Sequence, residues 1–105
     1  MQPAEETART RRFVGLAFRG ERASRRSRVI GSGLDVWEIA QMLEDFGSIG
    51  RLVRETHLTE PEIRLAEAYR DEFPEEIAQA IAENRRSPED LRSRYSFVEL
   101  ATNEQ

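Results

Sequence analysis

The stretch LTEPEIRLAEAYRDEF, residues 58–73, indicates where a helix begins, which side it buries and where it ends. Thr59 and Glu62 have the spacing of a capping box, and Pro61 stands in the first turn, where its missing N–H costs little. Apolar side chains then recur at helical spacing, at Ile63, Ala66, Tyr69 and Phe73. Because Pro74 disfavours helical geometry at the residue before it, we expect the helix to break there.

Two further helices are predicted before this one and another after it. From Asp35 a single apolar stripe runs through Val36, Ile39, Ala40, Leu43 and Phe46, and Gly47 ends the helix. Asp35 and Glu38 form a second capping-box-like pair. Ser48 caps a short helix that ends near His57 and carries Ile49, Leu52 and Val53. Pro74 opens the last helix, which holds Ile77, Ala78 and Ile81.

The N-terminal third has the pattern of a short β-hairpin. The segment RRFVGLAF alternates, with Val14, Leu16 and Phe18 on one face, and SRVIG is a second short apolar run. The polar stretch between them contains Gly20, which suits a turn. Residues 1–11 show neither helical nor strand periodicity, and we predict a flexible arm for them.

Three helices joined by tight turns suggest a helix-turn-helix, although a generic helical bundle without a DNA role has the same spacing. At 105 residues the chain makes one domain. We predict a mainly α fold with an N-terminal β-hairpin, a tri-helical helix-turn-helix and one or two C-terminal helices. Residues 1–11 are the flexible arm, 12–84 the hairpin plus helix-turn-helix domain, and 85–105 a C-terminal partner-binding tail.

Composition argues against several classes of protein. There is no cysteine, so no disulfide framework or thiolate site is expected. The first residues lack the apolar segment of a signal peptide, and no apolar run approaches the ~20 residues of a membrane helix. The single histidine, His57, stands at a predicted helix end, where it can interact with the dipole. We therefore expect a cytoplasmic protein that is not an enzyme and has no metal or cofactor.

The charges are distributed unevenly along the chain. Residues 1–31 hold eight arginines and three acids, whereas residues 32–105 hold eight arginines and seventeen acids. DNA affinity depends on neutralising phosphates, yet the stretch 58–73, which would be the groove-reading helix, carries five acids and two arginines. We expect the hairpin and arm to supply affinity, although a solvated hairpin face is the alternative. The predicted DNA contacts are Arg11, Arg12, Arg25, Arg26, Arg28, Arg64 and Arg70.

The ordered set RVIGSGLDVWEIAQML, GSIGRLV and LTEPEIRLAEAYRDEFPEEI resembles the family called domain of unknown function four-thirty-three. The resemblance runs from about Val29 to Ile81. Gly33 stands where that family often has Arg, and Arg70 where it often has a second aromatic residue. The family is similar to VapB-type antitoxins. The resemblance therefore implies an antitoxin of a type II toxin–antitoxin system that neutralises a PIN-type ribonuclease toxin and binds operator DNA as a dimer.

The tail differs in composition from the helices before it. Aromatic residues and arginine are enriched at interface hot spots, and an arginine can pair with the carboxylates of a nuclease site. The predicted toxin-binding residues are Arg85, Arg86, Arg92, Arg94, Tyr95 and Phe97. The alternative for the tail is that it covers the chain's own core. For Trp37 the alternatives are packing under the hairpin and a place in a dimer interface. The alternative function is a dimeric protein-interaction module without DNA binding.

Overall fold

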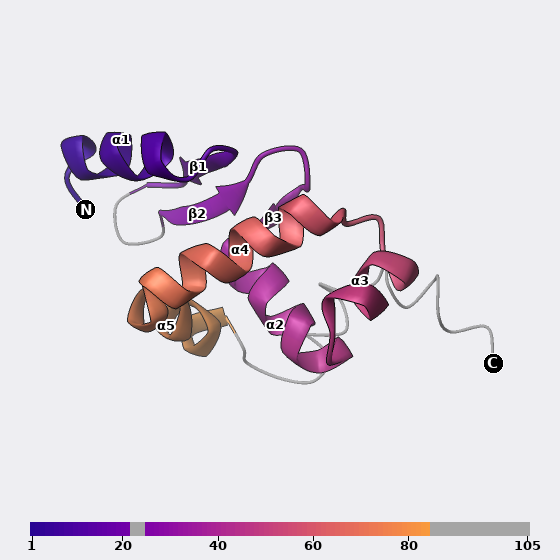
Figure 1. The fold of residues 1–105 in the computed structure, drawn as a ribbon. Helices are drawn as coiled ribbons and strands as arrows, with labels where there is room; N and C mark the ends of the chain where they lie inside the picture. The colour runs from indigo at the N-terminus through magenta and orange to yellow at the C-terminus, as the bar shows by residue number, and fades with distance from the viewer. Residues whose placement is uncertain (22–24, 85–105) are drawn as a thin grey trace.

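A computed structural model describes residues 1–21 and 25–84 (Figure 1). The described residues are mainly helical, with a small three-stranded antiparallel sheet near the N-terminus. The helices and strands, in chain order, are α1 (Pro3–Arg12), β1 (Leu16–Arg19), β2 (Arg26–Val29), β3 (Leu34–Asp35), α2 (Val36–Phe46), α3 (Ile49–Glu55), α4 (Glu60–Glu72) and α5 (Pro74–Asn84). None of these helices is both long and apolar enough to cross a membrane.

The sheet has the strand order β1-β2-β3, and its register separates an inner face from an outer one. Leu16 lies opposite Val29, and both are buried against the helices. Because successive side chains point to opposite faces, Arg19 and Arg28 belong to the outer face. The hairpin predicted from the alternating pattern is therefore present, with β3 as an additional edge strand.

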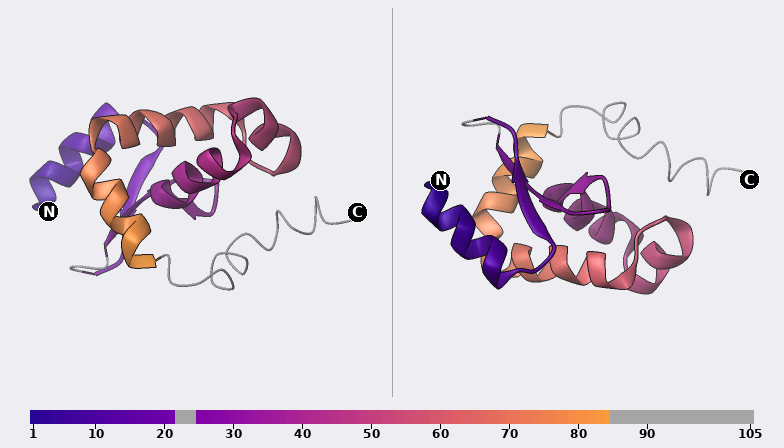
Figure 2. Two further views of the ribbon diagram at one scale, coloured as in Figure 1. Left: turned by 90° about the horizontal axis from the view of Figure 1, so that it is seen from below. Right: turned by 90° about the horizontal axis from the view of Figure 1, so that it is seen from above.

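Helix α2 lies at the centre of the core, packed against α4, α5, α3 and the sheet. Figure 1 and Figure 2 show α3 and α5 at opposite ends of α4, with α1 beside the hairpin. The apolar stripes of α2 and α4 face each other, and their central residues, Ile39 and Ile63, have no exposed surface. Burial of these stripes is the main source of stability for such a helical core.

The local signals in the sequence mark the helix ends correctly. The Thr59 Oγ1 accepts from the backbone N–H of Glu62 at 3.4 Å, and the Glu62 carboxylate accepts from the N–H of Thr59 at 3.0 Å. At the other end, Phe73 leaves helical geometry while its N–H still donates to the Tyr69 carbonyl. Gly47 ends α2 with a φ of 90°, in the left-handed region that favours glycine.

The structure corrects the expectation for the N-terminus. Pro3–Arg12 form helix α1, so the prediction of a flexible arm at residues 1–11 is wrong. Helix α1 has no buried residue, which is why no apolar period marks it in the sequence. Its contacts to the rest of the chain are instead polar and aromatic, and they involve Arg9 and Phe13.

Three smaller expectations also differ from the structure. Val14 does not share the buried face of Leu16, because β1 begins two residues later and leaves Val14 85% exposed. In α5 the buried residues are Ile77 and Ala80, while Ala78 lies on the exposed side of the helix. The two-residue strand β3 was not expected, because it exists only through its pairing with β2.

Candidate functional site

The outer face of the hairpin carries several arginines, with Asp35 of β3 directly opposite Arg28. Arg19 is exposed at the end of β1, and Arg28 is half-buried in β2. Within the described part of the chain, neither forms an ion pair at 4.0 Å or less. Arg19 and Arg26 are direct cross-strand partners, and of these two like charges only Arg26 has a counter-charge within the described residues, Glu83. This face can therefore accept an anionic partner.

Two arginines at the tip of the hairpin pair with acids from other elements. Arg25 binds Glu6 of α1, with Nε 2.6 Å from one carboxylate oxygen and Nη2 2.9 Å from the other. The hydrogen bond from Arg25 holds the pKa of Glu6 below its ordinary value. Arg26 reaches in the opposite direction and pairs with Glu83 near the end of α5. The hairpin tip is thus tied to both flanking helices by ion pairs.

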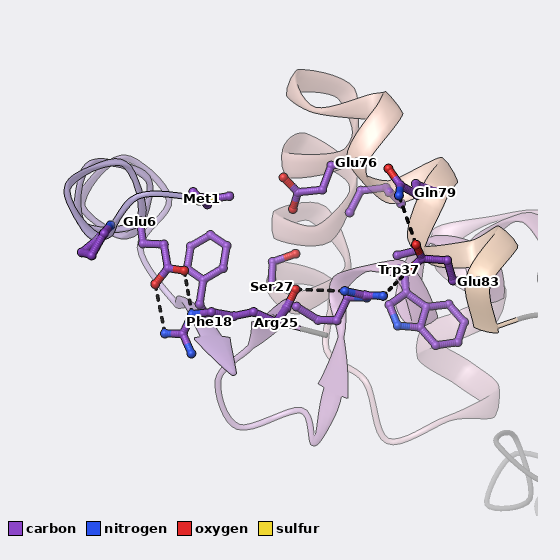
Figure 3. A pocket seen from close by; sticks show the side chains of 13 residues that line it. Met1, Glu6, Phe18, Arg25, Ser27, Trp37, Glu76, Gln79 and Glu83 are labelled. Atoms are coloured by element: carbon purple, nitrogen blue, oxygen red, sulfur yellow. Dashed lines mark hydrogen bonds and ion pairs between the residues drawn. The ribbon is translucent and has the colours of Figure 1, made fainter. Parts of the chain in front are cut away.

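These two ion pairs stand at the edges of a cleft of about 720 Å³ between α1 and α5 (Figure 3). Phe18, Trp37 and Ile77 supply apolar surface to it, and Glu76 and Gln79 supply polar groups from α5. Trp37 is only 2% exposed, and its Nε1 donates to the Asp35 carboxylate at 3.2 Å. Trp37 therefore packs inside the chain near the hairpin and is poorly placed to anchor a dimer.

A half-buried network fastens α1 to the junction of α4 and α5. The Arg9 Nη1 donates to the Tyr69 hydroxyl at 2.6 Å and to Glu76 at 2.7 Å, and the same hydroxyl donates to Glu76 at 2.9 Å. The guanidinium also lies 3.6 Å from the centre of the Phe73 ring. Burial raises the pKa of Tyr69 well above its ordinary range. This network is a structural tie, since its polar groups satisfy one another.

The remaining predicted DNA contacts are scattered over the other helices. In α4, Arg64 pairs with Glu60 at 2.7 Å and Arg70 with Asp71 at 3.2 Å. In α1, Arg12 pairs with Glu72 at 2.9 Å, whereas Arg11 is exposed and has no ion pair within the described residues. The structure therefore gathers Arg25, Arg26 and Arg28 on one hairpin and leaves the two arginines of α4 beside acids of their own helix.

Some predicted residues cannot be placed, and others were not foreseen. The proposed toxin-binding residues Arg85, Arg86, Arg92, Arg94, Tyr95 and Phe97 lie outside the described residues. Glu6 and Glu83 pair with the arginines at the hairpin tip and were not predicted as site residues. They are 19 and 57 residues from their partners, so no local spacing in the sequence links them. Arg19 belongs to the basic N-terminal third, and the alternation of β1 could have placed it on the outer face.

The single histidine belongs to a structural contact between a loop and a helix end. His57 Nε2 lies 3.0 Å from the Ser32 carbonyl oxygen, which joins the end of α3 to the loop before β3. Among the residues that the structure describes, no three His, Asp or Glu side chains are grouped so as to hold a metal ion. Comparisons with protein-family models, curated proteins and solved structures find no match for this chain.

Proposed function

We propose that the chain is an antitoxin-like protein that binds operator DNA as a dimer and neutralises a PIN-type nuclease. The observation that supports DNA binding best is the outer face of the hairpin, where neither Arg19 nor Arg28 forms an ion pair within the described residues, although Asp35 stands opposite Arg28 in β3. Phosphate neutralisation by arginine supplies most of the affinity of such proteins. A two-stranded ribbon also fits the major groove, so the hairpin can dock without help from a helix.

In this proposal α2, α3 and α4 form the helix-turn-helix, but α4 contributes little affinity. Its two arginines are paired with Glu60 and Asp71 of the same helix, so little positive charge is free there. Any contact by Arg64 would tune sequence preference, since base contacts specify while phosphate contacts position. The division of roles explains how an acidic helix and a DNA-binding module can belong to one chain.

The proposed dimer places the open end of the hairpin, opposite its tip, at the interface. Val14 and Ile30 are 85% and 60% exposed, and the hydrogen bond from the Ile30 N–H to the Gly15 carbonyl brings their segments together. Exposed apolar side chains beside an edge strand are features of an association surface. The toxin-neutralising role rests on the composition of residues 85–105, where four arginines flank Leu91 and are followed by two aromatic residues, Tyr95 and Phe97.

DNA binding is tested by fluorescence anisotropy with labelled duplex DNA taken from upstream of the coding frame, at several salt concentrations. We expect Arg19→Ala with Arg28→Ala to weaken binding and to lower the log–log salt slope by about 1.8, or about 0.9 for each lost phosphate contact. Arg51→Ala with Arg54→Ala removes the same charge from α3 and serves as the matched control. An unchanged slope in the hairpin variant would remove the hairpin from the proposal.

A second candidate is a dimeric protein-interaction module without DNA binding. This function is favoured because five of the predicted DNA contacts already form ion pairs with acids of the chain itself: Arg12, Arg25, Arg26, Arg64 and Arg70. Wild-type protein that shows no affinity for duplex DNA at low salt, yet copurifies with the product of the neighbouring reading frame, would select this function. Wild-type binding that falls steeply with salt would select the first.

A further inference from the structure

We propose that Arg25 and Arg26 form two phosphate-binding positions at the tip of the hairpin, and that Glu6 and Glu83 occupy these positions in the free protein. The inference rests on the proposed DNA-binding function and adds the regulation of that surface. Carboxylate and phosphate oxygens are recognised by the same planar fork of a guanidinium. The two glutamates therefore stand where phosphate oxygens of a nucleic acid would lie.

Arg25 is already arranged to receive an oxyanion. Its Nε and Nη2 bind the two oxygens of Glu6 side by side (Figure 3). Its Nη1 donates to the backbone carbonyl of Gly20 at 2.7 Å. The contact to Gly20 lies within the hairpin itself and does not depend on Glu6. Removal of the carboxylate therefore leaves the guanidinium anchored, with its bidentate edge open.

Arg26, like Arg25, binds a backbone carbonyl of the hairpin with one nitrogen of its guanidinium and a carboxylate with another. Its Nη1 donates to the backbone carbonyl of Arg25 at 3.1 Å, and its Nη2 pairs with Glu83. Gln79 holds the other oxygen of Glu83 through a hydrogen bond of 3.0 Å. Both anchors are thus carbonyls of the hairpin. Both acids come from helices that flank it, as Figure 3 shows for Glu6 and Glu83.

The acids are exchangeable because both ion pairs are partly exposed to solvent. Exposed side-chain surface is 40% for Arg25 and 15% for Glu6 in one pair, and 22% for Arg26 and 46% for Glu83 in the other. Surface ion pairs contribute little net free energy, and a nucleic acid offers a far denser row of negative charge. Glu6 and Glu83 therefore lower the affinity of the hairpin without abolishing it, and they disfavour weakly charged ligands most.

The test uses the full chain and a fluorescein-labelled duplex of mixed sequence, because phosphate contacts do not depend on sequence. Glu6→Gln with Glu83→Gln keeps the side-chain shape and removes both competing charges. We expect up to about fivefold tighter binding for each substitution. Glu44→Gln with Glu75→Gln changes net charge equally, at two exposed acids of α2 and α5 that form no ion pair within the described residues. Circular dichroism and thermal unfolding establish that both variants are folded.

A companion variant, Arg25→Ala with Arg26→Ala, should weaken binding and lower the log–log salt slope by about 1.8. Equal affinities for the Glu6/Glu83 variant and the Glu44/Glu75 control would overturn the inference, as would an unchanged slope in the arginine variant. In either case wild-type binding that depends on Arg19 and Arg28 would leave the proposed function standing. A wild-type chain and a Glu6/Glu83 variant that both fail to bind DNA would overturn the proposed function as well.

Discussion

Replacement of Tyr69 by Phe isolates the contribution of the network that fastens α1 to α4 and α5. The substitution removes one hydroxyl and keeps the ring, which packs edge-on against Phe13 at 5.3 Å and lies 4.8 Å from Phe73 between ring centres. The lost hydroxyl accepts from Arg9 and donates to Glu76. Any loss of stability therefore reports on hydrogen bonding and not on a cavity.

The expected loss of stability depends on which interactions of the network remain after Tyr69 is replaced by Phe. A hydrogen bond to a charged group contributes about 1.5–3 kcal/mol. Two such bonds are lost, but Arg9 and Glu76 still contact each other directly at 2.7 Å, so neither charge is left without a partner. We therefore expect a total loss near that of one bond, about 2 kcal/mol. In a domain of this size, that corresponds to a fall of roughly 10 °C in the unfolding midpoint.

The assay is urea unfolding followed by circular dichroism, at neutral pH and again at alkaline pH. Burial raises the pKa of Tyr69 from its ordinary value of 10.0, so above that pH the unfolded chain loses the phenolic proton while the folded chain keeps it. Stability therefore falls as the pH rises from 10 toward the higher folded-state pKa. The Phe variant lacks this titration, and the gap between the two proteins should narrow there.

A Tyr69→Phe protein within about 0.5 kcal/mol of wild type at neutral pH would refute this reasoning, because surface changes of no consequence fall in that range. A double-mutant cycle with Arg9→Met supplies the control. If the hydroxyl acts through Arg9, the two losses should be less than additive. Full additivity would mean that Tyr69 contributes through contacts other than this network.

Two further predictions concern the core. Ile63→Ala should lower the free energy of unfolding in urea by about 2–5 kcal/mol, because Ile63 is fully buried between α4 and α2. Val53→Ala, at a 39% exposed position, should lower it by less than about 1 kcal/mol. Equal losses for the two variants would contradict this packing. Trp37, the single tryptophan, should show blue-shifted emission that iodide quenches weakly and that shifts red on unfolding, and ready quenching of the folded chain would contradict its burial.

The sequence by itself determined the helices of the core, because their signals are local. A cap such as Thr59 or Asp35 and its glutamate are three residues apart, and the apolar stripe repeats within one or two turns. The same holds for the inner face of the hairpin, where alternation marks Leu16 and Phe18. Each of these features depends on residues close enough in the chain to act without the rest of the fold.

Only the tertiary structure decided that the N-terminus is helical and which arginines form ion pairs. Helix α1 has no apolar period, and it is tied to the fold by Arg9, whose partners Tyr69 and Glu76 are 60 and 67 residues away. The same is true of Arg25 and Arg26, whose charges are balanced by acids on separate helices. Attraction between charges depends on their distance in space and has no period along the chain. A sequence rich in both acidic and basic residues therefore does not reveal which arginines form ion pairs.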